Sequence, residues 1–381
     1  MKNGILFLFL TLSAFSSLTA QEAINLFGNL DFGPHLVGTK QLAVDHTTNG
    51  TSTSLSIQLW YPGNENGDKL IFSDYLNYKG KFSHQELLEN LSVGISGVPD
   101  AFPNNSLELV LNAQMKASKN VAPKNGQFPL LVWSMRYGTV ESQFLISEYL
   151  ASQGYVVAFV EDNPNSGFPW QLPSAEEKDS VLNQQIADLN HAITHLKKQQ
   201  NIDKDRIGIL SWSYAGESAI LTQMSNSDID LVVGLSSIGF SYGVYSGGEL
   251  PNKIVTDQIQ VPYLILSEKI GTNGKERTPP DIFDDMNSNS RYVSFEELSH
   301  GNFNAMEGMI PGILNTNKVQ SWSKGGKVAQ LGFETICKIA LSFINATLKP
   351  SNSSSFDDQM KELDQTLPPT FISVFQPKSQ N

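Results

Sequence analysis

Cysteine is scarce in this chain of 381 residues, which contains a single one, Cys337. One thiol cannot form an internal disulfide, so the folded protein must be stabilised through its core alone. Cys337 lies in an apolar pattern of helical period, where a cysteine is typically a small buried hydrophobic residue. A disulfide-stapled fold is therefore excluded.

Positive charge is also in short supply, because 26 Lys and Arg residues stand against 38 Asp and Glu residues. The formal net charge of −12 argues against nucleic acid and anionic membrane surfaces as partners. Long apolar runs are missing as well. Beyond the N-terminal leader, no stretch is long and apolar enough to predict a transmembrane helix.

Residues 1–20 have the features of a secretory signal peptide. Lys2 supplies the positive charge, residues 5–12 the apolar segment, and Leu18-Thr19-Ala20 a small-residue cleavage site before Gln21. The apolar segment is too short to span a bilayer, and no cysteine near the cleavage site indicates a lipid anchor. We therefore expect a secreted or periplasmic protein without a stable membrane anchor. Loss of Lys2 from a chain of charge −12 would leave a mature charge of −13.

Short apolar runs alternate with amphipathic segments from Phe128 onward. This alternation predicts an α/β fold with a mainly parallel central sheet and helices on both faces. Ligands of such sheets bind at the carboxyl ends of the strands. The expected strands span residues 129–134, 155–161, 207–210, 229–236, 263–267 and 292–296, and the expected helices include residues 141–153, 175–200 and 328–348.

The segment before this alternation divides into a hairpin and an insertion. Residues 37–44 and 55–60 predict an N-terminal antiparallel hairpin that turns at Asn49-Gly50. Residues 64–125 hold helical pieces separated by Gly, Pro and Asn, and predict a helical insertion that borders a substrate pocket. Its expected helices span residues 84–91 and 106–117.

Residues 350–381 are polar and rich in Ser and Pro, which predicts a loosely packed C-terminal tail. No internal repeat is evident in the rest of the chain. Residues 21–349 are therefore expected to form one α/β domain.

The segment Ser211-Trp212-Ser213-Tyr214-Ala215-Gly216 follows an expected strand and leads into helix-forming residues. A serine at the apex of a sharp strand-to-helix turn is the nucleophile elbow of the α/β-hydrolase fold. Small residues two before and two after the apex let the strand and the helix approach. Ser211 and Ala215 occupy those places, where the pattern G-x-S-x-G has glycines. The segment predicts Ser213 as a nucleophile, and the alternative is a serine that only caps the helix.

A serine nucleophile needs a general base, and the chain offers six histidines. His191 and His195 lie one helical turn apart, a spacing that can bind a metal, but no third ligand accompanies them and a solvated helix face is the better interpretation. His300 follows the last expected strand on a glycine-containing loop, where an α/β-hydrolase places its base after the nucleophile in chain order. The alternative for His300 is a loop histidine that caps the next segment. The remaining histidines, His35, His46 and His84, lie before the alternating region.

Four segments of the chain carry a resemblance to a known family. They are Phe32-Gly33-Pro34-His35-Leu36-Val37-Gly38-Thr39, Gln58-Leu59-Trp60-Tyr61-Pro62, Leu266-Ser267-Glu268-Lys269 and His300-Gly301-Asn302-Phe303. In them the chain resembles the platelet-activating-factor acetylhydrolase-like and dienelactone hydrolase-like branch of the α/β-hydrolase superfamily, over residues 32–348. The resemblance implies a secreted esterase that acts on short or oxidised acyl esters without a metal or another cofactor.

The chain departs from the family pattern at the first oxyanion segment, where Met135-Arg136-Tyr137-Gly138 replaces H-G-x-G. Backbone N–H groups can form an oxyanion hole without that histidine, so the N–H groups of Tyr137 and Tyr214 are the predicted donors. Arg136 either forms a surface salt bridge or faces the site and binds an anionic substrate.

The acid of the expected triad is the second departure. The family often has an aspartate after the strand that follows the elbow, and Leu235-Ser236-Ser237 occupies that place. The other acid position of the fold follows the next strand, where Glu268 stands, so Glu268 is predicted to orient His300. The alternative is a glutamate that is only ion-paired at a strand end. The other candidate acids are Asp281, Asp284 and Asp285.

Together these residues predict a secreted serine hydrolase that cleaves carboxylic esters through an acyl-enzyme. Ser213 would be the nucleophile, His300 the general base and Glu268 the orienting acid. We expect a small-molecule or lipid ester as substrate, and neither a metal nor another cofactor. The alternative is a degenerate hydrolase that binds a ligand or partner without turnover, because several supporting positions depart from the family pattern. A peptidase on the same fold is less favoured, since no propeller-type domain is evident, and the sequence does not indicate an oligomeric state.

Overall fold

The computed structural model describes residues 24–48, 51–77, 80–134, 139–161, 174–237, 254–255, 258–272, 274–350 and 354–377. The expected signal peptide, the expected turn at Asn49-Gly50 and the expected oxyanion donor Tyr137 lie outside these residues.

The described strands form one sheet of 11 strands in the order β11-β10-β9-β8-β7-β5-β6-β2-β1-β4-β3. The six neighbours from β6 to β10 in this order run parallel to one another. β1 and β2 form an antiparallel hairpin, and β2 pairs antiparallel with β6. The strands are β1 (Leu36–Thr48), β2 (Thr51–Gly63), β3 (Lys69–Ile71), β4 (Gln114–Lys119), β5 (Phe128–Ser134), β6 (Val156–Val160), β7 (Ile202–Trp212), β8 (Leu231–Leu235), β9 (Tyr263–Glu268), β10 (Arg291–Phe295) and β11 (Ile372–Phe375).

Helices cover both faces of this sheet. α5 and α6 share one apolar cluster with Ile209 of β7, whereas α4 and α9 share the other with Leu210, the next residue of the same strand. Successive strand residues point to opposite faces, so both faces must be apolar where both are covered. The predicted α/β fold, with its mainly parallel sheet and N-terminal hairpin, is confirmed. The helices are α1 (Phe72–Leu76), α2 (His84–Ser96), α3 (Asn104–Leu111), α4 (Val140–Ser152), α5 (Ala175–Leu196), α6 (Ala215–Ser225), α7 (Ala305–Gly308), α8 (Ile310–Ile313), α9 (Gly326–Leu348) and α10 (Phe356–Asp364).

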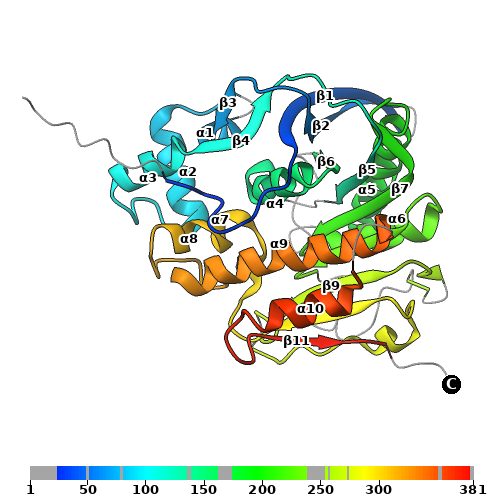
Figure 1. Cartoon of the computed structure of the whole chain (residues 1–381). Coiled ribbons are helices and arrows are strands. Elements are labelled where there is room, and N and C mark those ends of the chain that lie inside the picture. The colour runs from blue at the N-terminus through cyan, green and yellow to red at the C-terminus, as the bar shows by residue number, and fades with distance from the viewer. Residues whose placement is uncertain are drawn as a thin grey trace, which may run out of the picture.

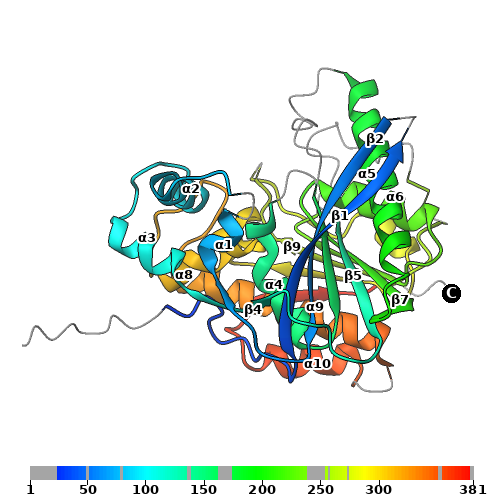
Figure 2. The same cartoon turned by 90° about the horizontal axis from the view of Figure 1, so that it is seen from above.

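The expected insertion holds strands as well as helices. α1, α2 and α3 lie within it and gather with α8 on one side of the molecule, at the left of both views (Figures 1 and 2). After α3 the chain forms β4, which pairs with β1 and β3. The helix expected over residues 106–117 is therefore wrong beyond residue 111. Met115 and Ala117 are buried while Gln114 and Lys116 are exposed, and this period of two suits a strand.

The segment expected to be a loosely packed tail folds onto the protein instead. α10 packs on α9, where the rings of Phe343 and Phe356 meet edge to face at 5.5 Å between centroids, and β11 pairs antiparallel with β10. Arg291 of β10 holds Asp357 of α10 through two hydrogen bonds of 2.9 and 2.8 Å. Figure 1 shows both elements along the lower edge of the molecule. The tail prediction is therefore wrong for residues 356–375.

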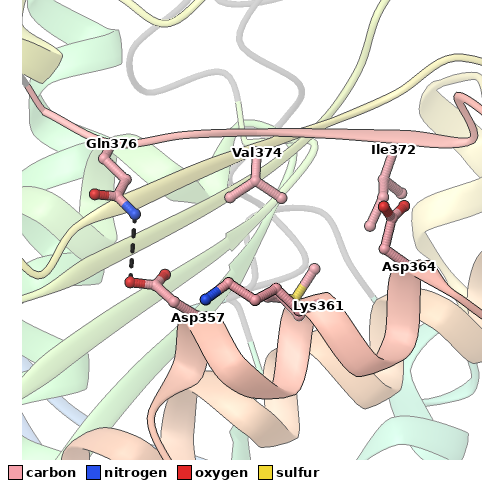
Figure 3. A pocket seen from close by; sticks show the side chains of 7 residues that line it. Asp357, Lys361, Asp364, Ile372, Val374 and Gln376 are labelled. Carbon is pink, nitrogen blue, oxygen red and sulfur yellow. Dashed lines mark hydrogen bonds between the residues drawn. The ribbon is translucent and has the colours of Figure 1, made fainter.

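A pocket of about 300 Å³ lies between α10 and β11 (Figure 3). The amide of Gln376 donates a hydrogen bond of 3.3 Å to Asp357 there. None of the residues predicted for catalysis lines it. The lining residues are Asp357, Met360, Lys361, Asp364, Ile372, Val374 and Gln376.

Among the described helices, α9 is long and apolar enough to cross a membrane by length and composition. The expectation that no stretch beyond the leader meets this measure is therefore wrong. Most of the apolar part of α9 is buried inside the protein, and Phe333, Ile336 and Ile344 are fully buried. This burial is that of a core helix.

A buried carboxyl group joins the insertion to the core. Glu148 of α4 is fully buried and accepts a hydrogen bond of 2.6 Å from the Tyr75 hydroxyl, whose oxygen accepts one of 2.7 Å from the Trp60 indole. The backbone N–H groups of Lys116 and Ala117 donate to the second carboxylate oxygen of Glu148 at 2.8 and 2.9 Å. Burial is the largest influence, and it raises the pKa of Glu148 to about 7 despite these hydrogen bonds.

Raising the pH from about 5 to about 8 should lower the free energy of unfolding through Glu148. The folded protein keeps this proton up to about pH 7, whereas the unfolded chain releases it near the ordinary value of 4.5. The stabilisation is therefore fully present below pH 4.5 and is lost as the pH rises to about 7. It amounts to at most about 3 kcal/mol. Denaturant unfolding of the parent and of Glu148→Gln should show a shallower pH dependence in the variant, and equal slopes would contradict this role.

Candidate active site

Ser213 occupies a sharp turn between β7 and α6. Its φ is +57°, a left-handed conformation that is unfavourable for a residue with a Cβ atom. Its amide donates a hydrogen bond of 3.1 Å to the carbonyl of Leu235 in β8, which holds the turn against the sheet. Ser211 and Ala215 are fully buried on either side, as the close approach of strand and helix requires. This is the geometry of a nucleophile elbow.

The first small position of the elbow belongs to a buried cluster of hydroxyl groups. The Ser211 hydroxyl lies 3.2 Å from that of Ser237, which donates to the carbonyl of Ser213 at 3.4 Å. Burial raises the pKa of the Tyr263 phenol beside them. The hydroxyl that replaces the expected glycine is thus hydrogen-bonded, as a buried polar group must be.

His300 begins a short 3-10 helix, His300–Phe303, that follows β10. The Asn302 carboxamide is buried and makes four hydrogen bonds of 2.9 to 3.1 Å to backbone groups around the loop. Phe303 packs edge to face on Phe295, with ring centroids 5.6 Å apart. A Cβ atom on Gly301 would collide with the side chains that pack on the loop. Gly301, Asn302 and Phe303 therefore hold the loop in the conformation that presents His300.

The loop brings His300 to Ser213, with Nε2 lying 3.0 Å from Oγ. The Trp212 indole stacks on the imidazole, with ring centroids 5.4 Å apart and planes 17° apart. Burial lowers the pKa of His300, the negative charge of Glu268 opposes that change, and Arg277 adds to it. A neutral imidazole within hydrogen-bond reach of a serine hydroxyl can act as its general base.

The other ring nitrogen of His300 faces Ser236, at the position where the acetylhydrolase-like family often has an aspartate. Nδ1 lies 2.6 Å from the Ser236 hydroxyl, which donates to Oε2 of Glu268 at 2.6 Å. Oε1 of Glu268 is 3.8 Å from Nδ1 and 3.1 Å from the guanidinium of Arg277. The structure thus combines the two interpretations of Glu268, because its carboxylate is ion-paired and also linked to the imidazole through one hydroxyl.

The order of the strands explains why these groups meet. Ser213, Ser236 and Glu268 lie at the carboxyl ends of β7, β8 and β9, which are neighbours in the sheet, and His300 follows β10. Sequence reasoning identified Ser236 only as the place of a missing aspartate. It had no signal for Arg277, which lies on the loop after β9 and reaches back to Glu268.

The structure places the other predicted residues as follows. Tyr214 directly follows Ser213 and is the N-cap of α6, and Tyr137 and Arg136 lie outside the described residues. The alternative acids belong to the 3-10 helix Asp281–Asp285, whose Phe283 ring contacts Tyr292 near the start of β10. That is the opposite end of the strand from His300. The alternative acids are Asp281, Asp284 and Asp285.

Among the described residues, no group of three or more His, Cys, Asp or Glu side chains is placed to hold a metal ion. The ring of His191 packs on that of His46, with centroids 4.2 Å apart, and its Nε2 lies 2.9 Å from the carbonyl of Asp45. His46 in turn lies 3.1 Å from the carboxylate of Asp188. His191 therefore contacts the end of β1 rather than forming a pair with His195.

Comparisons with known proteins agree with the fold. The family model for platelet-activating factor acetylhydrolase, isoform II, matches residues 29–172. Among solved structures, a ferulic acid esterase from Streptomyces cinnamoneus is similar, with a TM-score of 0.60 and 16% sequence identity over 90% of this chain and 97% of that chain. No match to a curated protein sequence was found. The chain thus has the α/β-hydrolase fold and is similar, over residues 29–172, to platelet-activating factor acetylhydrolase, isoform II.

Proposed function

We propose that the protein is a serine hydrolase that cleaves carboxylic esters. The observation that carries this proposal is the 3.0 Å contact between Ser213 Oγ and His300 Nε2 at a turn of positive φ. A strained serine within reach of a buried histidine suits acyl transfer. An ester is favoured over other acyl substrates because the two comparisons describe an acetylhydrolase and an esterase.

The reaction proceeds through an acyl-enzyme. His300 Nε2 takes the proton of Ser213 as Oγ attacks the ester carbonyl, and the backbone N–H groups of Tyr214 and Tyr137 are the proposed donors to the oxyanion. His300 then gives the proton to the departing alcohol. Water activated by the same imidazole releases the acyl group. The negative charge of Glu268 stabilises the imidazolium that forms in both halves of the reaction.

The proposed substrates are small-molecule or lipid esters with short acyl groups, as the acetylhydrolase description suggests. We also propose that the protein is secreted or periplasmic after cleavage before Gln21. The intact mass of protein from the medium or periplasm should correspond to a chain that starts there. An uncleaved chain in the membrane fraction would contradict export.

A fluorophosphonate probe, which reacts with activated serines, tests the enzyme. The parent should be labelled and Ser213→Ala should not. Ser218→Ala is the matched control, because it removes a buried hydroxyl from the helix that follows Ser213 and should keep its labelling. Hydrolysis of p-nitrophenyl esters of rising acyl length then defines the acyl group. A folded protein that neither reacts with the probe nor hydrolyses esters would favour the alternative, a hydrolase fold that binds a ligand without turnover.

A further inference from the structure

We propose that Ser236 is a positioning residue that fixes the tautomer of His300 and transmits the charge of Glu268 to it. Its hydroxyl lies 2.6 Å from His300 Nδ1 and 2.6 Å from Glu268 Oε2, while Oε1 of Glu268 lies 3.8 Å from Nδ1. A single hydroxyl thus takes the place in which a triad normally has a carboxylate oxygen. The catalytic part of this inference rests on the proposed ester hydrolysis, and the tautomer part rests on the contacts alone.

The hydrogen bonds of Ser236 determine which ring nitrogen carries the proton. A serine hydroxyl has one proton to donate, and an ionised carboxylate can only accept. Ser236 therefore donates to Glu268, and its oxygen is left to accept from the N–H group at Nδ1 of His300. With the proton on Nδ1, Nε2 presents its lone pair to Ser213, as a general base requires.

Arg277 supplies the positive charge that pairs with the Glu268 carboxylate. Its guanidinium lies 3.1 Å from Oε1 of Glu268, and the two side chains are 8% and 0% exposed. Guanidinium stays protonated in proteins, and a buried charge without a partner is strongly unfavourable. The pair therefore remains charged, and the carboxylate continues to accept from Ser236.

No proton passes from the ring to the acid during the reaction. When His300 takes the proton of Ser213, the N–H group at Nδ1 continues to donate to Ser236, and the Ser236 hydroxyl continues to donate to Glu268. The hydroxyl holds the imidazolium in place and is itself oriented by the carboxylate. Charge on Glu268 thus stabilises the imidazolium through a polarised hydrogen bond.

The backbone conformation at Ser236 allows its hydroxyl to be removed without disturbing the main chain. Its φ is +41°, directly after β8, and its amide donates to the carbonyl of Leu266 at 2.7 Å. Glycine adopts this conformation without strain. Ser236→Gly therefore removes the hydroxyl and keeps the backbone, so that lost activity cannot be attributed to an incompatible main chain.

Ser236→Gly should lower kcat about 10- to 150-fold, which is the effect of losing a hydrogen bond to a charged group, and leave KM within about twofold. Ser236→Ala should show the same loss. Ser267→Ala, which removes a buried hydroxyl from the neighbouring strand end, is the control and should retain the parent kcat within about twofold. A kcat of Ser236→Gly within about twofold of the parent overturns the proposal.

Nitrogen NMR of histidine-labelled protein supplies a readout that needs no turnover. Above the pKa of His300, the parent should show the proton on Nδ1, and Ser236→Gly should show a mixture of both tautomers. An unchanged tautomer in the variant also overturns the proposal. If the parent neither hydrolyses esters nor reacts with the serine probe, the proposed function fails, and the NMR result still decides the role of Ser236.

Discussion

Replacing His300 with alanine should reduce kcat/KM for p-nitrophenyl acetate by about six orders of magnitude, the scale of losing the base of a serine hydrolase. In the proposed mechanism, His300 Nε2 is the base that lies 3.0 Å from Ser213 Oγ, and the hydroxyl needs that base to lose its proton at neutral pH. Because burial lowers the pKa of His300, the parent activity should reach its plateau below the pH expected from the ordinary value of 6.5. A pH–rate profile of the parent measures this directly.

Folding must be measured beside activity, because His300 is largely buried. Its side chain is 14% exposed and stacks on Trp212, so alanine leaves a void and should lower the free energy of unfolding by about 1–2 kcal/mol. The loop itself is held by Asn302 and should persist. His191→Ala and His195→Ala are the controls and should keep activity within about twofold, as should treatment with a chelator. Loss of activity on chelation would show that a metal acts and that the serine mechanism is wrong.

Glu268→Gln should remove activity and stability together. An amide in place of the triad acid costs about four orders of magnitude in turnover where the acid contacts the histidine directly, so a loss of three to four orders (~10³–10⁴) is expected here. The same change leaves the buried guanidinium of Arg277 without its counter-charge, which should lower the free energy of unfolding by about 3–5 kcal/mol. Kinetics and denaturant unfolding of the same preparation separate the two effects. A variant as active as the parent would show that Glu268 only forms an ion pair at the end of β9 and has no part in catalysis.

Ser236→Asp provides the matched comparison, because its effect should depend on residue 268. Alone, it places a second carboxylate where the Ser236 hydroxyl now lies 2.6 Å from Glu268, so like charges meet in a buried site and activity should fall. In the Glu268→Gln background that repulsion is absent. The new carboxylate can then contact His300 Nδ1 directly and also supply a negative charge near Arg277. Part of both the activity and the stability should return in the double variant, and its failure to exceed Glu268→Gln would contradict this arrangement.

Much of the fold and the positions of Ser213 and His300 could be predicted from the sequence, because the patterns that indicate them are local. Buried parallel strands are visible as short apolar runs, and the elbow is a serine between such a run and a helix. The motif around His300 was recognisable because Gly301, Asn302 and Phe303 each have a packing or hydrogen-bonding role in that loop.

The remaining features depend on contacts between distant parts of the chain. Arg277 follows β9 on a polar loop, and nothing local indicates that its side chain returns to Glu268. Ser236 could be identified as a missing acid, but its bridging contact depends on the separation of the ends of β8 and β9. Likewise, β11 has only four residues and becomes a strand because β10 has an edge to pair with.

Backbone strain at Ser213 places the proposed activity and conformational stability in opposition. Ser213 at +57° and Ser236 at +41° both have left-handed backbones, where glycine relieves strain on the order of 1 kcal/mol. A laboratory selection for heat resistance alone would therefore favour glycine at position 213, whereas at position 236 the loss of the hydrogen bond to the buried Glu268 carboxylate would offset the relieved strain. The variants it enriched at position 213 would be better tolerated by the fold and would have lost the proposed nucleophile, so thermostabilisation of this scaffold has to leave Ser213 unchanged.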